Sequence, residues 1–368
     1  MTNRNEVIDF IRGFSILSVI LLHCKIHLKI DESLLSITWV KWLLSSGYYG
    51  VMSFFVVSGF LITSTCIRKW NKLQSINIGQ FYLMRFSRII PCLVALLTVL
   101  SFLHLIGIKK FIIQNTSLQQ SLFSALTFQI NWLEAKVGYL PANWDILWSL
   151  SVEEIFYLFF PLLCLMLRNK KHLVFAMFIF ILIGPLARTK FTDNDIWGEH
   201  SYLSCMDGIA IGCLAAMFAD KLRSITLSRF LFTLGCLLFG FIFFFRRQAF
   251  DIGITSLGLN VTLLEIGIAM IILATQQVNF KWFNSIRWFG RNSYEIYLTH
   301  SFVVLFVAGI LYRSNQPTWL IVTEYLVVVL CSGLLGQLIA SYYSEPLNRY
   351  IREKSFIPKL SYSLRSYD

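Results

Sequence analysis

Charged side chains are scarce in this sequence. Asp, Glu, Lys and Arg make up 14% of its 368 residues, whereas soluble domains carry about 25%. So few charges cannot cover a globular surface, which excludes a cytosolic enzyme, a secreted domain and a disordered chain. Hydrophobic residues reach 56% and aromatic residues 16%. The composition therefore predicts an all-α protein, a polytopic bundle of transmembrane helices embedded in the lipid bilayer.

The sequence also lacks paired cysteine motifs and glycine-rich phosphate loops. Its eight cysteines lie mostly inside apolar runs, and none forms a Cys-x-x-Cys pair. Neither a disulfide framework nor a zinc site is indicated, so we expect no metal and no permanently bound cofactor. The first apolar run contains Arg12 and His23 and has no small-residue cleavage site. We interpret this run as a retained helix rather than a cleaved signal peptide.

Long apolar runs recur along the chain. A helical span needs about 20 mostly apolar residues, and the pattern predicts about ten spans. They cover residues 8–27, 48–67, 88–108, 148–167, 173–187, 202–219, 230–245, 254–275, 294–312 and 319–342. We therefore assign residues 1–345 to one transmembrane domain and residues 346–368 to a short basic tail.

Basic residues are distributed unevenly between the two sides of the predicted bundle. One alternate set of connections, together with both termini, holds 20 Lys and Arg residues, and the other set holds 11. Because cytoplasmic loops carry the excess of basic residues, both termini are expected in the cytoplasm of a multi-pass inner-membrane protein. The net charge of +12 is then explained by the membrane surface. No basic segment alternates with exposed aromatics, so nucleic acid is not expected as a partner.

The first predicted span carries ionisable residues, which are costly inside a bilayer and usually functional. Arg12 and His23 are eleven residues apart, which is about three helical turns, so both side chains point the same way with about 16 Å between them. Asp9 lies one turn before Arg12 and could orient it. The alternatives are an arginine that extends to the interface and a structural histidine.

A pair of arginines lies at the start of the third span. Arg85 and Arg88 are three residues apart and therefore neighbours on one helical face at its cytoplasmic end. Paired guanidinium groups can bind phosphate oxygens bidentately, which favours an anionic ligand. The alternative interpretation is an ordinary basic anchor at the membrane surface.

Polar residues also recur in the fourth and ninth spans. Ser149 and Glu153 are four residues apart and share a helix face. By the predicted orientation, Glu153 and His23 both lie toward the outer leaflet, where a carboxylate and an imidazole form a plausible proton-transfer pair. A buried structural glutamate is the alternative. Tyr297 and His300 share a face at the start of the ninth span, and we interpret them as packing or cavity-lining residues.

Five stretches together resemble the membrane-bound acyltransferase family 3, whose members O-acetylate bacterial surface polysaccharides. They are DFIRGFSILSVILLH (9–23), GVMSFFVVSGFLIT (50–63), RFSRIIP (85–91), WSLSVEEIFYLFFP (148–161) and SYEIYLTH (293–300). The stretches occur in the family's order and extend over most of the chain. The family's Arg-x10-His, Arg-x-x-Arg and Ser-Leu-x-x-Glu patterns fall on Arg12 and His23, Arg85 and Arg88, and Ser149 and Glu153.

The resemblance implies an acyl-CoA donor, most simply acetyl-CoA, that enters from the cytoplasm. The acceptor is a hydroxyl of an extracytoplasmic or lipid-linked glycan, such as the O-antigen of lipopolysaccharide. We expect Arg85 and Arg88, with Arg12, to hold the CoA phosphates. Small polar groups such as Ser58 and Ser149 are expected along the path of the substrate.

His23 is the expected general base, which takes the proton of the attacking sugar hydroxyl. Glu153 is expected to orient His23 or to hold the acceptor. An acyl intermediate on His23 stays open as a second route. The sequence departs from the family at Met52, where many members have an acidic residue, so a proton-transfer role there is in doubt.

A secondary transporter or a flippase is the alternative class of protein, because a bundle with buried Arg, His and Glu residues suits either. The sequence shows no inverted repeat with paired spans broken by Gly or Pro, which is the usual signature of such transporters. Acyl-transfer chemistry is therefore the favoured prediction.

Overall fold

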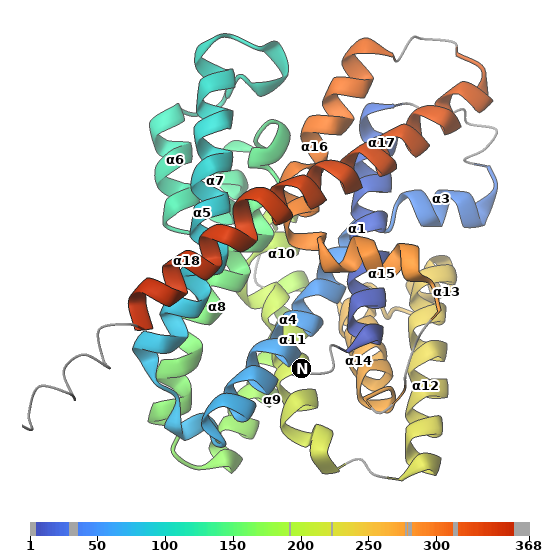
Figure 1. Ribbon diagram of the computed structural model, residues 1–368. Coiled ribbons are helices and arrows are strands. Elements are labelled where there is room, and N and C mark those ends of the chain that lie inside the picture. The colour runs from blue at the N-terminus through green and yellow to red at the C-terminus, as the bar shows by residue number, and fades with distance from the viewer. Residues whose placement is uncertain are drawn as a thin grey trace, which may run out of the picture.

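The computed structural model is an all-helical bundle (Figure 1). It describes residues 5–28, 36–190, 193–221, 224–276, 278, 282–311 and 316–356, with side chains as far as residue 354. Across these residues there is no β-strand, and nine helical segments are long and apolar enough to cross a membrane. The prediction of a polytopic transmembrane helical bundle is confirmed.

The long helices follow the predicted apolar runs. They are α1 (Glu6–His27), α4 (Gly47–Trp70), α5 (Ile78–Leu105), α8 (Leu147–Met166), α9 (Lys170–Thr189), α11 (Tyr202–Phe218), α12 (Ile225–Phe244), α16 (Ser293–Ile310) and α17 (Thr318–Ile339). The shorter ones are α3 (Thr38–Leu44), α6 (Leu118–Leu126), α7 (Ile130–Val137), α10 (Asp195–His200), α13 (Arg246–Asp251), α14 (Leu259–Ala274), α15 (Asn284–Arg291) and α18 (Glu345–Phe356).

Single helical turns connect some of these elements. Four are 3₁₀ turns, namely η1 (Leu73–Ser75), η2 (Lys109–Phe111), η3 (Ala142–Trp144) and η4 (Ala219–Lys221). The fifth, η5 (Ala340–Ser344), is a π-helical turn that joins α17 to α18. Such turns are frequent near functional sites because they shift the direction of the helix that follows.

Two predicted spans differ from the helices that form. The eighth predicted span, residues 254–275, corresponds to α14, which has only 16 residues. Gly258, at φ +68°, is not helical, so the helix begins after it, at Leu259. The third starts ten residues earlier than predicted, at Ile78, where the Asn77 side chain accepts a hydrogen bond from the backbone N–H of Gln80. The polar residues of this first part lower its hydropathy and hide it from a search for apolar runs. Arg85 and Arg88 consequently lie inside α5.

Helix α4 lies at the centre of the bundle, packed between α1 and α11. A Cβ atom on Gly59 would lie 2.0 Å from the carbonyl oxygen of Ile209, and one on Gly212 would lie 2.1 Å from that of Val56. The two helices therefore approach at backbone contact distance, as small residues permit in membranes. This contact fixes the α4 face that carries Ser58.

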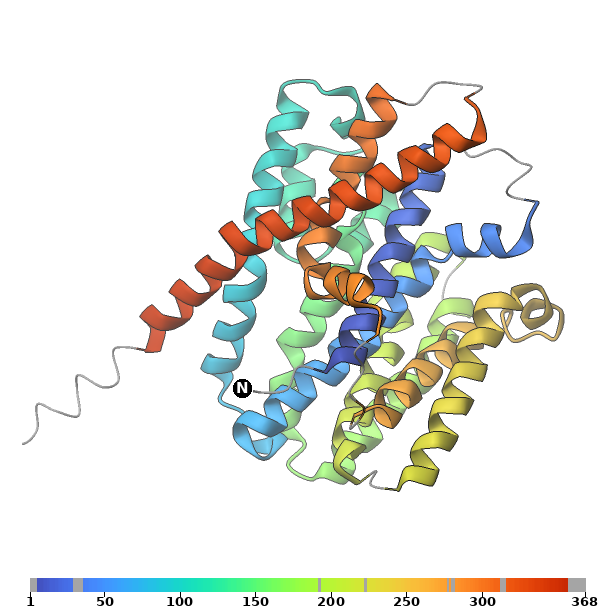
Figure 2. The same cartoon turned by 45° about the vertical axis from the view of Figure 1, so that its right-hand side comes forward.

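The chain from α17 through η5 to α18 forms one long rod across the bundle (Figure 2). Its C-terminal part lies beside α5 in both views and packs against that helix. Part of the segment that we assigned to a basic tail, residues 346–356, is therefore helical. Arg352 of α18 donates from Nε to the Ser87 hydroxyl at 3.2 Å and from Nη2 to the Met84 carbonyl at 3.1 Å.

Candidate functional site

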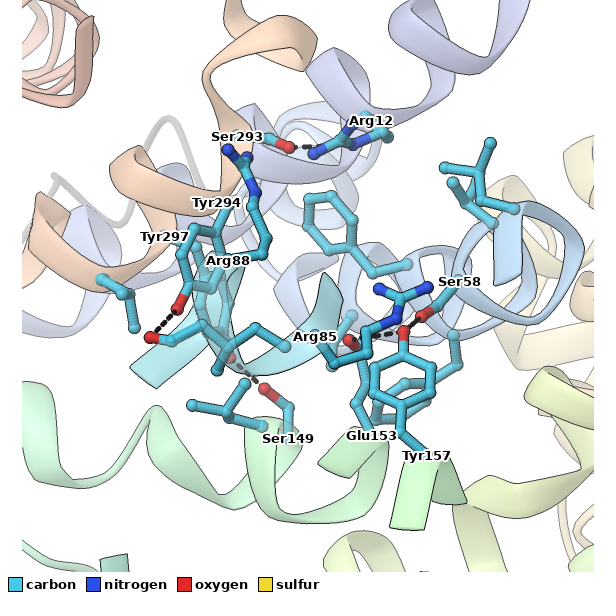
Figure 3. A pocket seen from close by; sticks show the side chains of 18 residues that line it. Arg12, Ser58, Arg85, Arg88, Ser149, Glu153, Tyr157, Ser293, Tyr294 and Tyr297 are labelled. Atoms are coloured by element: carbon cyan, nitrogen blue, oxygen red, sulfur yellow. Dashed lines mark hydrogen bonds between the residues drawn. The ribbon is translucent and has the colours of Figure 1, made fainter. Parts of the chain in front are cut away.

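A cavity of about 230 Å³ lies among α1, α4, α5, α8 and α16 (Figure 3). It brings together seven of the side chains that the sequence analysis singled out. These are Arg12, Ser58, Arg85, Arg88, Ser149, Glu153 and Tyr297. Five helices from distant parts of the sequence thus contribute to one site.

Three guanidinium groups line this cavity. Arg85 Cζ lies 4.2 Å from the ring centroid of Tyr157, and Arg88 Cζ lies 5.3 Å from that of Tyr294. Arg12 donates from Nε to the Ser293 hydroxyl at 3.1 Å. Stacking on aromatic faces holds an arginine in place while its N–H donors stay available. The arrangement therefore presents several oriented cationic donors to one cavity.

A carboxyl group, that of Glu153, lies beside Arg85 in the cavity wall. The Tyr157 hydroxyl donates to Glu153 Oε2 at 3.3 Å, and it is also hydrogen bonded to the Ser58 hydroxyl. Figure 3 shows Arg85, Ser58, Glu153 and Tyr157 gathered on one side of the cavity. The four-residue spacing of Glu153 and Tyr157 on α8 makes this hydrogen bond possible. The cavity lining thus carries three arginines and one carboxyl group.

Tyr297 marks another part of the cavity wall. Its hydroxyl lies 2.7 Å from the Ser149 hydroxyl and donates to the Ile146 carbonyl at 3.0 Å. These bonds join α16 to the first turn of α8. The ring centroid of Tyr297 is also 5.9 Å from that of His300. Tyr297 therefore connects the cavity to a pair of histidines beside it.

That pair consists of His23 and His300. Their ring centroids are 4.9 Å apart, with an angle of 65° between the ring planes. His300 is fully buried, and its Nδ1 lies 2.7 Å from the Tyr297 carbonyl oxygen. A carbonyl oxygen can only accept a hydrogen bond. Nδ1 of His300 is therefore protonated and donates to the Tyr297 carbonyl. His23 is less buried than His300.

Three predicted site residues lie outside the cavity lining. Among the residues that the structure describes, the wall includes none of Asp9, His23 and His300. Asp9 is buried in the first turns of α1 and does not line the path. Glu153 contacts Tyr157 in the cavity wall, and the ring of His23 packs on His300 beside it.

Several residues of the site were not anticipated. Tyr157 carried a signal, because it shares a face with Glu153, and Ser293 and Glu295 lie in the SYEIYLTH stretch, but the sequence did not indicate their partners. Glu295 Oε1 lies 3.4 Å from Arg88 Nη1 and accepts a hydrogen bond from Ser344 of the π turn at 2.7 Å. Its partners come from α5 and η5, far away in sequence, so periodicity alone could not reveal them.

A second polar cluster holds the start of α8. The His200 ring stacks on Trp148 with centroids 3.8 Å apart, and its Nδ1 lies 4.0 Å from Glu134 Oε2. Burial, followed by the nearby Asp145 carboxyl group, raises the pKa of Glu134. Asn143 donates to the Leu298 carbonyl at 2.8 Å, which ties the turn before α8 to α16. The cluster fixes the helix that presents Ser149 and Glu153 to the cavity.

Comparison with known proteins assigns the family. Residues 5–338 match a family model described as an acyltransferase domain. The chain belongs to the membrane-bound acyltransferase family 3. The family resemblance inferred from the five sequence stretches is therefore confirmed.

The similar proteins include O-acetyltransferases of Staphylococcus aureus and Listeria monocytogenes. The chain is 26% identical over 384 residues to O-acetyltransferase OatA of Staphylococcus aureus (strain NCTC 8325 / PS 47), covering 96% of this chain and 58% of that protein. It is 24% identical over 378 residues to peptidoglycan O-acetyltransferase OatA of Listeria monocytogenes, covering 95% of this chain and 56% of that protein. The chain thus spans little more than half the length of these relatives. No solved structure matches it.

Proposed function

We propose that the protein is an integral-membrane O-acyltransferase. It moves an acyl group, most simply acetyl, from cytoplasmic acyl-CoA to a hydroxyl of an extracytoplasmic or lipid-linked glycan. The observation that carries the proposal is the cavity with three arginines and one carboxyl group. Arg88 also pairs with the buried Glu295, and the positive charge that the arginines bring to the cavity favours an anionic ligand. The family supplies the class of reaction.

The donor end of the proposed site is the arginine side of the cavity. Arg85 and Arg88 bind phosphate oxygens of CoA, since oriented guanidinium groups form charge-assisted, bidentate hydrogen bonds. Arg12, held by Ser293, adds a third cation to the same cavity. The thioester arm extends from these residues past Tyr297 toward the histidine pair. No tightly bound cofactor is needed for this scheme.

The reaction occurs at His23. Its imidazole removes the proton from the acceptor hydroxyl as that oxygen attacks the thioester carbonyl. A C–O ester bond forms, the C–S bond breaks, and the proton passes from His23 to the departing CoA thiolate. Glu153, oriented by Tyr157, holds the acceptor hydroxyl through a hydrogen bond. In the two-step variant, His23 carries the acyl group before the hydroxyl attacks.

The names of the relatives support one acceptor class. The name of the Listeria monocytogenes protein specifies peptidoglycan, which favours a cell-wall glycan over the O-antigen of lipopolysaccharide as the first acceptor to test. Lipopolysaccharide stays a prediction from the sequence. Both acceptors offer sugar hydroxyl groups outside the cytoplasm, so the same chemistry applies to either.

Purified protein in lipid nanodiscs tests the proposal. With acetyl-CoA and a soluble peptidoglycan fragment or O-antigen oligosaccharide, we expect free CoA to accumulate in equal amount with an O-acetylated glycan detected by mass spectrometry. A transporter or flippase would release no CoA under these conditions. Absence of both CoA release and glycan ester with every acceptor, from protein that remains folded, would contradict the proposal.

A further inference from the structure

The cavity is too small for a whole acyl-CoA molecule. Its volume is about 230 Å³, whereas pockets that enclose drug-sized ligands measure about 300–1,000 Å³. Acyl-CoA is larger than such a ligand, because it carries an adenosine with three phosphate groups besides the pantetheine arm. Only the thioester part fits inside. The nucleotide end must therefore lie outside the cavity, next to Arg85 and Arg88.

Helix α18 places another arginine at this position. Arg352 is held by the Ser87 hydroxyl and the Met84 carbonyl, both on the turn of α5 that carries Arg85 and Arg88. Both of these partners are neutral, so the positive charge of Arg352 is oriented but not neutralised by them. The guanidinium group still has N–H donors beyond the two in these bonds.

A lysine from a third element reaches the same turn. Lys69, near the end of α4, lies with its Nζ 3.4 Å from Met84 Sδ. Basic side chains from α4 and α18, Lys69 and Arg352, therefore converge on Met84 of α5, and neither belongs to the cavity lining. Like charges this close repel one another. A bound polyanion would offset this electrostatic repulsion.

The orientation of α18 is coupled to the donor cavity. Ser344, the last residue of the π turn, donates to Glu295 Oε1 at 2.7 Å, and the same oxygen lies 3.4 Å from Arg88 Nη1. Glu295 is almost fully buried. The start of α18 is thereby anchored to a residue that contacts a cavity arginine. The position of Arg352 is a consequence of that anchor.

We propose that Arg352, together with Lys69, forms a separate phosphate site at the contact between α18 and α5 that binds the terminal ribose phosphate of acyl-CoA. The inference rests on the proposed function and extends it, because it divides donor recognition between two sites. Arg85 and Arg88 bind the diphosphate, and Arg352 binds the phosphate monoester at the nucleotide end. An anionic lipid headgroup offers similar chemistry and is the competing source of phosphate.

The test compares three donors: acetyl-CoA, acetyl-dephospho-CoA, which lacks only the terminal phosphate, and acetyl-pantetheine. Dissociation constants are measured for wild type, Arg352→Ala, Arg352→Lys and the matched control Arg349→Ala, whose side chain is exposed on the same helix. We expect Arg352→Ala to weaken the binding of acetyl-CoA about tenfold or more, because a charge-assisted hydrogen bond is lost. Its affinity for acetyl-dephospho-CoA should stay unchanged, which also shows that the variant is folded.

The remaining outcomes are distinct. Arg352→Lys should recover part of the loss, and Arg349→Ala should bind all donors like wild type. Equal weakening of acetyl-CoA and acetyl-dephospho-CoA, or no weakening of either, overturns the assignment. Anionic nanodisc lipids could stabilise the wild-type protein more than zwitterionic lipids do. If Arg352→Ala loses that difference in stability while its affinity for acetyl-CoA is unchanged, the site binds a lipid headgroup instead. If wild type binds no acyl-CoA at all, the proposed function itself fails.

Discussion

The imidazole rings of His23 and His300 lie edge to face, with centroids 4.9 Å apart, although they belong to the first and the ninth long apolar segments of the sequence. His300 is fixed by the backbone carbonyl of Tyr297 and is fully buried. We infer that its ring orients His23, the proposed base, through this edge-to-face contact. In this proposal, His23 is the base and His300 is its positioning residue.

Replacement of His23 tests the chemical step. His23→Ala should lower glycan acylation by about 10²–10⁴-fold, the usual contribution of a general base. Binding of acyl-CoA should change little, because the loss affects the reaction rather than donor affinity. Turnover by CoA release and affinity by calorimetry measure the two effects separately.

His300 provides the matched control for that experiment. His300→Ala should reduce turnover less than His23→Ala, because His23 remains, and His300→Phe should retain more activity than His300→Ala by preserving an aromatic contact with His23. Near wild-type turnover of His23→Ala at normal expression would remove His23 as the base. Glu153 would then be the leading candidate.

The arginine pair of α5 should determine donor affinity. Arg85→Ala/Arg88→Ala should weaken acyl-CoA binding strongly while the protein still inserts and accumulates. Lysine replacements should recover only part of the affinity, because an ammonium group lacks the planar fork of donors. Arg168→Ala, an exposed basic residue just after α8, is the control. Normal acyl-CoA binding by the double variant would reduce Arg85 and Arg88 to topological anchors.

A buried ion pair away from the cavity should determine stability. Arg188 Nη2 lies 2.6 Å from Asp207 Oδ2, with both side chains buried, and Thr262 donates to the same oxygen at 2.6 Å. Asp207→Asn removes one charge and leaves the other without its partner, which should cost about 3–5 kcal/mol.

Thermal unfolding in detergent measures that loss. The double variant Arg188→Met/Asp207→Asn should be less destabilised than the sum of the two single changes, because it removes both members of the pair together. Strict additivity of the two changes would show that the pair does not interact energetically.

The orientation of the chain can be measured with reporters. A reporter fused after Asp368 should be cytoplasmic, and one inserted near Asp193 should be external, because the excess of basic residues lies on the side of the termini. The hydrogen bonds of Arg352 to the Met84–Ser87 turn place α18 and the α5 arginines on one side of the bundle. The reverse result would invert the proposed directions of donor and acceptor entry.

Hydropathy predicted most of the long helices, because a run of about 20 apolar residues is an intrinsic property of the segment. It missed the start of α5, where polar residues and an asparagine cap decide the boundary, and it did not predict α15 or the helical form of residues 346–356. The spacing of Arg85 with Arg88, and of Ser149 with Glu153, correctly predicted shared faces.

Contacts between side chains on helices that are far apart in the sequence could not be predicted. A helical period shows which residues share a face, but not which distant helix that face meets. The partners of Ser293, Glu295 and Arg352 therefore carried no signal. The contacts that the structure shows for Glu153 and His23 are those with Tyr157 and His300, respectively, and their proximity to each other stays a prediction. The family resemblance located the arginines and His23 without indicating these neighbours.

Helix α16 contacts α1 at two points, through Ser293 to Arg12 and through His300 to His23. The two contacts lock the register of these helices at both ends of the segment between the proposed phosphate-binding arginine and the proposed base. That segment is about 16 Å long. In the proposed reaction, the fixed distance along this pair of helices sets the length of the donor arm that can reach the base. A thioester on a shortened pantetheine arm would bind through its phosphates and yet stop short of the attacking hydroxyl, so the enzyme would select its donor by length as well as by charge.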